Sequence, residues 1–423
     1  MALASRNEDR LGLGRDDDDE GGAPRSAGAR LWLFLAAAAA LVGAVFAAYS
    51  TSDFIQHLDR QMHSIHCSIV PGGGASVGES GCRTVMMSPY SSLFRTSMWG
   101  GMPISLLALG TFAYLAYRAA DLALKRTLAR REVTFLVVAT LLPVGMSAIY
   151  GYISTQVIHA VCTVCVGIYG SSVAAFVFAL LAMTKAERAE VPAPYARWFA
   201  EGVGYVGVLV ALYMALAPQM DKSLDGCGTL AKKDDPNNIL IPFGGPKSGT
   251  PAIAVLDPLC PSCKAFDERM QVSGLYDRLS TQVALFPLDK SCNWNVRDSM
   301  HPGACAIAEA MLCDRENFTK ILDWAFARQE ELINEAKADE TKLRARLEQT
   351  FPAVKGCLGT PQAKLKVAKS LKWAVANGIP VLTPQLFIGD QRVCDEDTDL
   401  GLEYTVNAMI ARTQGAPARG GRR

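Results

Sequence analysis

The residues best able to do chemistry in this chain are its cysteines, of which there are twelve among 423 residues. Two pairs have the C-x-x-C spacing, Cys162/Cys165 and Cys260/Cys263. Two cysteines three residues apart can close a strained and easily reduced disulfide, which suits a redox carrier better than a structural crosslink. Such a high count is unusual inside cells and favours an oxidising compartment outside the cytoplasm. The chemistry to expect is therefore thiol–disulfide exchange.

The first pair, Cys162 and Cys165, opens a long apolar segment. On a helix the two side chains would share one face. Cysteine in a membrane helix is also often just a small apolar residue, so the spacing alone leaves a redox role and a packing role open. Tyr169 lies one turn beyond Cys165, where it would either line the same pocket or serve as an interfacial aromatic residue.

A further pair, Cys67 and Cys82, is separated by the glycine-rich segment 71–81. This composition is too flexible for a rigid fold, so the loop could carry thiols between two reaction partners. A structural disulfide is the alternative. His66 would favour a thiolate at Cys67. Because His63, His66 and Cys67 do not complete a four-ligand pattern, we expect no metal here.

Cys260 and Cys263 lie between a predicted strand, residues 251–256, and a predicted helix, residues 264–270. At a helix N-terminus, exposed N–H groups and the helix dipole favour a thiolate at Cys260. Cys263 is then placed to attack a mixed disulfide. Zinc binding by this lone C-x-x-C stays open as the alternative, since other cysteines are available.

This strand–C-x-x-C–helix order resembles thioredoxin, and a second mark of that fold follows at Thr383-Pro384. The resemblance implies that Pro384 is cis and faces the C-x-x-C, and that Thr383 contacts the substrate chain. About 120 residues separate Cys263 from Pro384. This distance implies an inserted helical subdomain, as in the DsbA and DsbC branches of the superfamily, over residues 235–412.

Six cysteines remain, and six can pair in fifteen ways. We favour structural disulfides, with Cys292–Cys305 and Cys313–Cys357 as the suggested pairs. An accessory redox relay is the alternative. The six are Cys227, Cys292, Cys305, Cys313, Cys357 and Cys394.

Long apolar segments place the first half of the chain in a membrane. A helix of about 20 residues crosses a hydrocarbon core about 30 Å thick. Residues 133–184 contain no Asp, Glu, Lys or Arg and are too long for one helix, so they predict a hairpin that turns near 151–158. No small-residue cleavage site follows the first segment, which favours an uncleaved span over a signal peptide. The predicted spans are 31–49, 98–117, 133–152, 159–182 and 202–220.

The basic residues predict the orientation of these spans. They gather in segments 118–131 and 183–199, whereas the 50–97 loop has few and the 151–158 turn has none. The positive-inside rule then places the N-terminus in the cytoplasm and everything after residue 220 outside. All twelve cysteines fall on or near the outer side. The formal net charge of +1 gives no electrostatic case for nucleic acid binding.

Three motifs within residues 30–185 together resemble the vitamin K epoxide reductase family. They are Cys82-Arg-Thr-Val-Met-Met-Ser88-Pro-Tyr, Gly100-Gly-Met-Pro103 and Cys162-Thr-Val-Cys165. That family has a four-helix bundle around a quinone, with a loop cysteine pair, a serine and a fourth-helix C-x-x-C. The implied fold class is a membrane α-helical bundle of four helices with a fifth tethering helix, followed by an α/β thioredoxin-like domain carrying a helical insertion.

The resemblance also implies a role for each matching cysteine. Cys67 would meet the electron donor, Cys82 would exchange with Cys162, and Cys165 would face the quinone. One departure is the spacing between Cys67 and Cys82, which is longer than the family usually shows.

The implied cofactor is ubiquinone or menaquinone, bound near Ser88, Tyr169 and Cys165. By resemblance to fused family members, we expect a multi-pass protein of a bacterial cytoplasmic (inner) membrane, with the thioredoxin-like domain on the periplasmic side. The predicted domains are a disordered cytoplasmic tail (1–30), the quinone-binding bundle (31–185), the fifth transmembrane helix and linker (186–234), the thioredoxin-like domain (235–412) and a second disordered tail (413–423).

These features together predict an oxidoreductase that makes disulfide bonds in reduced client proteins outside the cytoplasm. Electrons would pass from client thiols to Cys260/Cys263, then to Cys67/Cys82, then to Cys162/Cys165, and finally to the membrane quinone. Two alternatives stay open. The same chemistry could run in reverse to supply a DsbC-like isomerase, or the chain could be a membrane-anchored chaperone without enzymatic activity.

Overall fold

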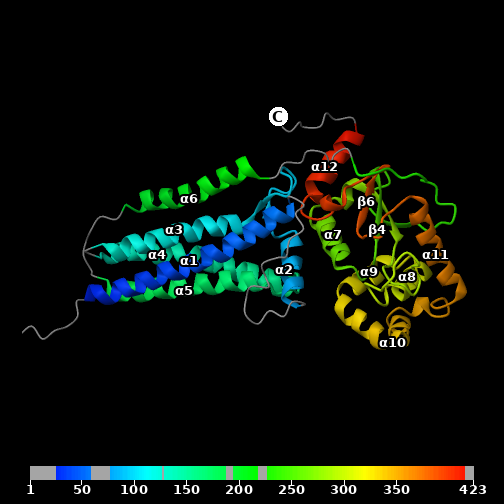
Figure 1. Ribbon diagram of the computed structural model, residues 1–423, viewed down its shortest axis with the longest axis horizontal. Helices are drawn as coiled ribbons and strands as arrows, with labels where there is room; N and C mark the ends of the chain where they lie inside the picture. The colour runs from blue at the N-terminus through cyan, green and yellow to red at the C-terminus, as the bar shows by residue number, and fades with distance from the viewer. Residues whose placement is uncertain (1–24, 59–76, 126–127, 187–193, 218–225, 415–423) are drawn as a thin grey trace, which may run out of the picture.

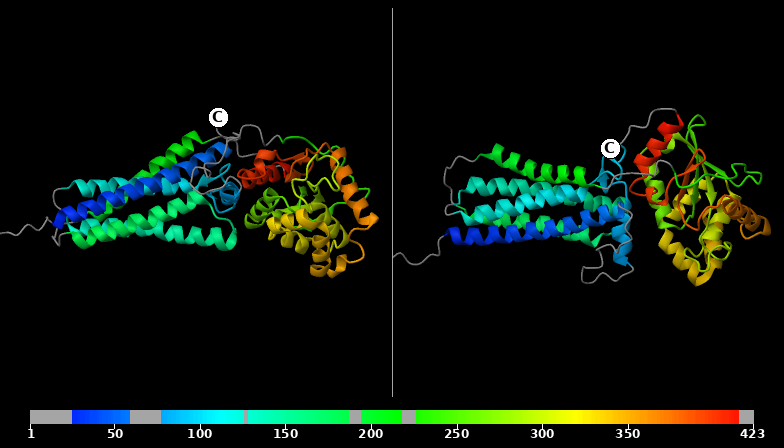
Figure 2. Two further views of the ribbon diagram at one scale, coloured as in Figure 1. Left: turned by 60° about the horizontal axis from the view of Figure 1, so that its bottom comes forward. Right: turned by 45° about the horizontal axis from the view of Figure 1, so that its top comes forward.

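The computed structural model describes residues 25–58, 77–125, 128–186, 194–217 and 226–414. They form two parts placed end to end, a long helical bundle and an α/β domain (Figure 1). Figure 2 shows the same arrangement from two other sides. The predicted division into a helical half and an α/β half is confirmed.

Five long helices make up the bundle, and α1 packs against both α3 and α5. A stripe of alanines on α1, including Ala36, Ala40 and Ala44, is buried in this contact. Small side chains let helix backbones approach closely, which is the usual basis of packing between membrane helices. The long helices are α1 (Arg25–Leu58), α3 (Ile104–Leu124), α4 (Arg130–Tyr152), α5 (Thr163–Lys185) and α6 (Tyr195–Leu216).

Among the described residues, four helices are long and apolar enough to cross a membrane: α1, α4 with its continuation, α5 and α6. The predicted second span, α3, falls outside this group and carries Arg118 and Asp121 in its last turns. These two residues form an ion pair of 2.7 Å, and the Arg118 guanidinium lies 4.0 Å from the centre of the Trp198 ring. The charge of Arg118 thus has a carboxylate and an aromatic ring as partners inside the bundle, where α6 packs on α3.

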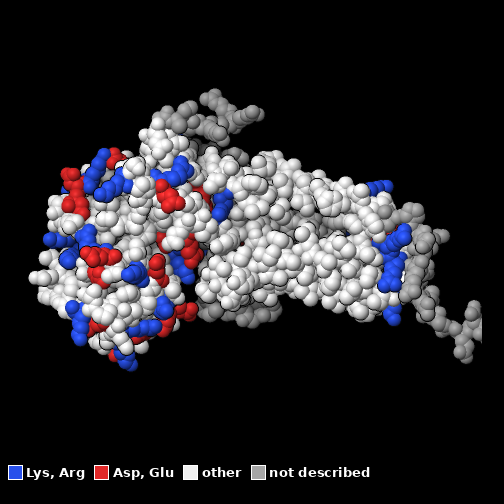
Figure 3. Space-filling model, turned by 180° about the vertical axis from the view of Figure 1, so that it is seen from behind, with Lys and Arg blue, Asp and Glu red and all other residues white. Residues whose placement is uncertain are grey.

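The outer face of the bundle has the character of a lipid-facing surface. Figure 3 shows a broad band without Lys, Arg, Asp or Glu between the α/β domain and the opposite end of the bundle, where Lys and Arg gather. Large apolar side chains such as Leu41, Val138, Leu142, Val173 and Val208 are exposed on the bundle helices. Apolar exposure on this scale indicates contact with lipid.

Several helix boundaries differ from the predicted spans, among them the end of α1, which lies at Leu58 rather than at residue 49. Helix α3 begins at Ile104 rather than 98, because Pro103 is its extended N-cap residue and β2 (Met102–Pro103) pairs with β1 (Ser92–Leu93). Helix α4 runs on through a π-turn, Ile153–Val157, so the hairpin turns at 158–162 rather than 151–158. Helix α6 ends at Leu216, four residues before the predicted end.

The α/β domain is built on a five-stranded sheet in the order β3-β5-β4-β6-β7. Strands β4 and β5 are parallel, so the helix between them, α7, crosses over one face. Strand β6 is antiparallel to β4 and follows the cis bond Thr383–Pro384, which confirms the cis isomer predicted for Pro384. The strands are β3 (Ile241–Gly244), β4 (Thr250–Leu256), β5 (Leu279–Leu285), β6 (Gln385–Ile388) and β7 (Gln391–Arg392).

Helices cover both faces of this sheet. Helices α7 and α12 contact each other on the face toward the bundle, while α8 and α11 contact each other on the far face (Figure 1). The insertion between β5 and β6 is helical, as predicted. The helices are α7 (Pro261–Val272), α8 (Ala304–Cys313), α9 (Phe318–Phe326), α10 (Gln329–Thr350), α11 (Pro361–Ala376) and α12 (Leu402–Thr413).

Three disulfides crosslink the α/β domain. Both suggested pairs, Cys292–Cys305 and Cys313–Cys357, are confirmed. The third, Cys227–Cys394, joins the entry of the chain into the domain to the segment after β7. The six cysteines left over by the motif analysis are therefore paired as crosslinks.

A buried arginine fixes the α/β domain against the membrane bundle. Arg269 on α7 is fully buried, and its Nη1 donates to both carboxylate oxygens of Glu403 on α12, at 3.0 and 2.9 Å. Its Nη2 donates to the carbonyl of Ser88 at 3.0 Å, and its Nε donates to the carbonyl of Met87. Arg95 of the membrane half also lies 3.4 Å from Glu403.

Other contacts extend this interface between the two domains. The Trp99 indole N–H donates to Asp397 at 2.9 Å, and His57 lies 2.7 Å from the Asp399 carboxylate. Phe54, Leu58, Trp99 and Leu400 form an apolar cluster beside them. Because charged, polar and apolar groups all make contacts across this interface, the two domains form one continuous structure in this region.

We expect Arg269→Leu to loosen this interface. Removing one partner of a buried ion pair leaves an uncompensated charge and costs about 3–5 kcal/mol. Urea unfolding of the full chain in detergent should show this loss, and amide exchange at Ser88–Ser91 should accelerate. Arg346→Leu is the matched control, because Arg346 pairs with Glu331 and Glu335 near the surface, where such pairs contribute about 0–1 kcal/mol. Equal stability of both variants would contradict the role of Arg269.

Candidate active site

The membrane cysteine pair lies where the chain turns into α5. Cys162 is the N-cap residue, with extended backbone angles (φ −100°, ψ 115°), and the helix starts at Thr163. The expectation that Cys162 and Cys165 share one helix face is wrong, because Cys162 precedes the first turn. Its Sγ accepts a hydrogen bond from the Cys165 backbone N–H at 3.2 Å, and the two cysteines form a disulfide. This sulfur therefore lies at the positive end of a helix dipole.

Cys82 lies beside this pair on α2 (Val77–Met87), a helix that the sequence analysis did not predict. Its Sγ is 3.4 Å from the Cys162 Sγ, and both residues are buried. Gly81 makes the approach possible, because a Cβ at this position would overlap the carbonyl oxygen of Val161. The glycines before Cys82 were taken as a mark of flexibility, but Gly81 instead permits close packing. Cys82 is itself disulfide-bonded.

A cavity of about 330 Å³ opens between the helices next to these sulfurs. Cys82, Cys162 and Cys165 all line it, and so do Ser88 and Tyr169. The remaining walls are mostly apolar side chains of α1, α3, α4 and α5. All five predicted site residues in the described part of the membrane half thus meet at one cavity, whereas Cys67 lies outside the described residues.

The cavity also has polar residues that the sequence analysis missed. Asp53 on α1 is 3% exposed and lines the cavity. Tyr150 and Ser147 on α4 and Ser172 on α5 line it as well, with the two serine hydroxyls 3.0 Å apart. Asp53 had a recognisable signal, because it is the only acidic residue between 31 and 58. An ionisable residue within a membrane span is rare and is usually functional.

The hydroxyl of Ser88 is already engaged within the chain. It donates to the carbonyl of Val85 at 2.7 Å, and the residue is 1% exposed. In this rotamer the oxygen can still accept a hydrogen bond from a group in the cavity. The backbone carbonyl of Ser88 is the one that accepts from Arg269, so this residue contacts both the cavity and the domain interface.

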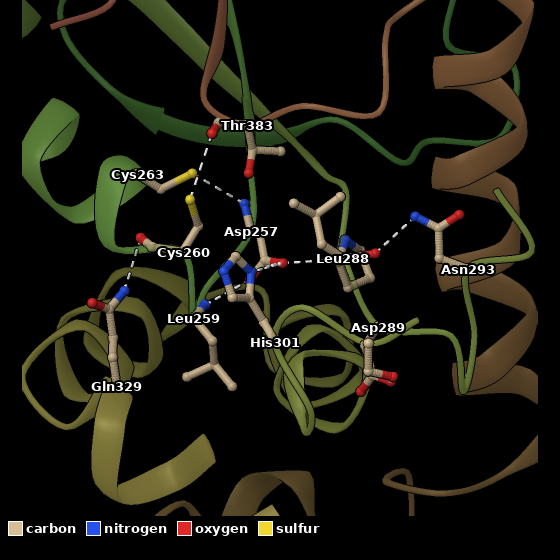
Figure 4. A network of polar contacts seen from close by, with 12 residues as sticks. Asp257, Leu259, Cys260, Cys263, Leu288, Asp289, Asn293, His301, Gln329 and Thr383 are labelled. Atoms are coloured by element: carbon tan, nitrogen blue, oxygen red, sulfur yellow. Dashed lines mark hydrogen bonds and ion pairs between the residues drawn. The ribbon is translucent and has the colours of Figure 1, made fainter. Parts of the chain in front are cut away.

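The second cysteine pair occupies the corresponding position at the start of α7. Cys260 is the N-cap residue, also with extended backbone (φ −79°, ψ 120°), and Pro261 takes the first helical position. The Cys260 thiol donates to the carbonyl of Thr383 at 3.5 Å, directly before the cis proline. Figure 4 shows the two sulfurs beside each other and close to Thr383. Thr383, Pro384 and the C-x-x-C are therefore brought together.

The two thiols of this pair have opposite electrostatic surroundings. A hydrogen bond from Cys263 lowers the pKa of Cys260 to about 7, against the opposing effect of burial. Burial raises the pKa of Cys263 well above its usual value. Both cysteines are free thiols in this structure. The thiolate therefore forms preferentially on Cys260.

No group of three or more His, Cys, Asp or Glu in the described part of the chain could hold a metal ion. His63 and His66, which were weighed with Cys67 as ligands, lie outside that part. The sulfurs of Cys260 and Cys263 contact Thr383 and Asp257.

Comparison with solved structures finds similar chains, two of which are described here. The crystal structure of Proteus mirabilis ScsC in a transitional conformation is 19% identical, covers 51% of this chain and 95% of that chain, and has a TM-score of 0.29. A linker-deletion mutant of ScsC is 20% identical, covers 53% and 100% of the two chains, and has a TM-score of 0.30. No curated protein matches the chain.

The family comparison agrees with the motifs found in the sequence. Residues 34–180 match the model described as the Vitamin K epoxide reductase family. This range contains Cys82, Ser88, Cys162, Cys165 and Tyr169, and it coincides with the bundle that surrounds the cavity. Residues 34–180 therefore match the vitamin K epoxide reductase family as one part of this chain, and they are joined to an α/β domain with a C-x-x-C at a helix start and a facing cis proline.

Proposed function

We propose that this protein oxidises thiols of client proteins to disulfides and passes the electrons to a membrane quinone. The observation that carries the proposal is the 3.4 Å approach of Cys82 Sγ to Cys162 Sγ at the wall of an apolar cavity. A sulfur at this distance from a disulfide is in position for exchange. Exchange there links a thiol donor outside the cavity to an acceptor inside it.

The cavity suits a quinone ring. Small-molecule sites are concave and mostly apolar, with a few polar groups that fix orientation, and range from about 300 to 1,000 Å³. Here the polar groups at the wall include Ser88, Tyr169 and Asp53, and Cys165 lies beside them. A quinone bound there would accept two electrons and two protons. Ser88 and Tyr169 would orient its oxygens, and the apolar walls would exclude water.

The charge distribution supports the predicted orientation. Lys and Arg gather at the end of the bundle away from the α/β domain (Figure 3). Under the positive-inside rule that end is cytoplasmic, so the α/β domain and the described cysteines lie on or near the extracytoplasmic side. Cys162 follows the turn at this outer end, which is where a periplasmic thiol donor and a membrane quinone can both reach it.

The relay is a sequence of balanced exchanges. A client thiolate attacks Cys260 of the Cys260–Cys263 disulfide, and Cys263 leaves as a thiolate. A second client thiolate then attacks the mixed disulfide, so that a client S–S bond forms and the electron pair stays on Cys260. The reduced pair next reduces a disulfide of Cys67 and Cys82.

The last protein step takes place at the cavity. The Cys82 thiolate attacks Cys162, the Cys162–Cys165 bond breaks, and the electron pair leaves on Cys165, which lines the cavity. Resolution of the Cys82–Cys162 bond by Cys67 leaves both membrane cysteines reduced. Two electrons are then available to the acceptor, and Cys162 and Cys165 close again.

The order of this relay can be tested with the purified full chain in detergent, following quinone reduction spectroscopically. Wild type should reduce quinone with either a reduced unfolded protein or a small dithiol as donor. Cys162→Ala and Cys165→Ala should fall to the background rate with both donors. Cys260→Ala should fail only with the protein donor, because a small dithiol can reach the membrane cysteines directly.

A double variant, Cys313→Ala with Cys357→Ala, serves as the control for this experiment. It removes a crosslink remote from both exchange sites, so it should lower stability by about 2–5 kcal/mol while electron transfer remains. Quinone reduction by Cys165→Ala at the wild-type rate would refute the relay. If the wild type does not reduce quinone and its Cys260/Cys263 pair stays reduced in cells, electrons flow in the opposite direction. That result would favour the alternative in which the membrane domain supplies a DsbC-like isomerase.

The assignment of Cys260 as the attacking thiol predicts a simple pH dependence. Only the thiolate reacts with iodoacetamide, so labelling of reduced Cys260 should rise with pH and reach half its maximum near the pKa of about 7. Cys263 should stay unlabelled over this range, because its pKa is raised and its side chain is buried. Mass spectrometry of the peptides distinguishes the two. Preferential labelling of Cys263 would reverse the assigned roles.

A further inference from the structure

A histidine distant in sequence lies beneath the cysteine pair of the thioredoxin-like domain. His301 comes from the loop before α8, and its Nδ1 is 2.8 Å from the Oδ2 of Asp257, which begins the strand-to-helix turn after β4. Asp257 is fully buried, and His301 is 8% exposed. Figure 4 shows the imidazole next to Cys260, on the side opposite to Thr383.

The Asp257 carboxylate is held so that it can orient this imidazole. Its Oδ1 accepts from the backbone N–H of Leu259 at 2.7 Å, and its Oδ2 accepts from that of Leu288 at 2.6 Å. The backbone N–H of Asp257 in turn donates to the Sγ of Cys263 at 3.5 Å. The carboxylate, the imidazole and both sulfurs thus belong to one connected cluster.

The loop that carries His301 is also fixed in place. The Cys292–Cys305 disulfide closes it, and the His301 backbone N–H donates to the carbonyl of Leu288 at 3.2 Å. Asp289 accepts from the backbone N–H of Gly303 at 2.8 Å, just beyond His301. The position of the imidazole is therefore set by the fold and does not depend on a mobile side chain.

We propose that the imidazolium of His301, held in place by Asp257, stabilises the thiolate form of Cys260. This thiolate is the group that leaves when the client disulfide is released, and it keeps the electron pair. Pro261 and Ser262, which stand between the two cysteines, bring no charge of their own. The positive charge near Cys260 comes instead from His301, which lies on a separate loop. The inference rests on the proposed exchange at Cys260.

The charges around His301 favour its protonated form. Burial alone would lower the pKa of His301, but the hydrogen bond and the charge of Asp257 outweigh it, and Cys260 and Asp289 add to the effect, so this pKa is raised. The groups that face it are Asp257 at the end of β4, Cys260 at the start of α7 and Asp289 on the loop after β5. A raised pKa extends the charged form of the imidazole to higher pH, toward the range in which the Cys260 thiolate forms.

This charge acts on the final step of client oxidation. The leaving sulfur is Cys260, and a sulfur leaves faster when its thiolate is better stabilised. Because the cysteine pair itself carries a negative charge beside the imidazolium only when it is reduced, the imidazolium also favours the reduced form over the disulfide. The Cys260–Cys263 disulfide is therefore a stronger oxidant with His301 than without it.

The test compares the full-length wild type with His301→Gln. Glutamine keeps a hydrogen-bond donor for Asp257 but has no charge. We expect the half-maximal pH for iodoacetamide labelling of Cys260 to rise. We also expect the equilibrium of the pair with glutathione to shift roughly tenfold toward the disulfide, since one charge at close range changes a thiol pKa by about one unit.

His57→Gln is the matched control, because His57 forms an equivalent 2.7 Å contact with Asp399 at the domain interface, away from the cysteine pair. It should leave both measurements unchanged. Wild-type labelling and wild-type glutathione equilibrium in His301→Gln would overturn the proposal.

A third measurement separates charge from a purely structural role, even where His301→Gln lowers stability. The reduced and oxidised forms are each unfolded in urea. Loss of the imidazolium should destabilise the reduced form more than the oxidised form, because only the reduced form has a thiolate to stabilise. Equal destabilisation of both forms would overturn the proposal. None of these measurements uses a quinone, so their outcome is independent of the relay to the membrane.

Discussion

The positively charged side chain of Arg269 is fully buried. The relative position of the two domains depends on the groups that form hydrogen bonds with it. Its guanidinium binds the Glu403 carboxylate within the thioredoxin-like domain and the carbonyls of Met87 and Ser88 in the membrane domain. A guanidinium offers five donors in a fixed planar fork, so it can serve a carboxylate and two carbonyls at once, which a lysine cannot match. Because Ser88 also lines the cavity, this interaction connects the thioredoxin-like domain directly to the wall of the membrane site.

Both cysteine pairs use the same local geometry. Cys162 and Cys260 are each the extended N-cap residue of a helix, and their partners lie in the first turn. The helix end supplies free N–H groups and a positive partial charge, which favour a thiolate at the first sulfur. What differs is the surroundings. Cys260 faces the cis-proline loop and a charged cluster, whereas Cys162 faces Cys82 and an apolar cavity, so in the proposed relay one geometry would serve protein thiols and a membrane-soluble acceptor in turn.

Sequence reasoning reached the features that depend on local patterns. The length of apolar segments predicted the bundle, the spacing of Cys260 and Cys263 predicted a helix start, and Thr383-Pro384 predicted the cis bond. Features that depend on contacts between distant segments were missed. Arg269 meets Glu403 across 134 residues, and His301 meets Asp257 across 44 residues, so neither pairing leaves a periodic or spacing signal. Helix α2 was missed because its glycines also fit a flexible loop. Only the close contact with Val161 in the structure explains why residue 81 is a glycine.

The contacts between the two domains limit how far the domains could move apart during a reaction cycle of the proposed relay. Helix α7 contacts the membrane domain through Arg269 near its C-terminal end, whereas Cys260 stands at its N-terminal end, about 14 Å away at 1.5 Å per residue. Separation of the domains would expose the apolar cluster of Phe54, Leu58, Trp99 and Leu400, and burial of such side chains contributes about 1.5–3 kcal/mol each. A cycle that required separation would therefore pass through a rarely populated state at each turnover. Because Cys260 lies at the end of α7 away from this interface, the exchange proposed at Cys260 is compatible with domains that stay docked.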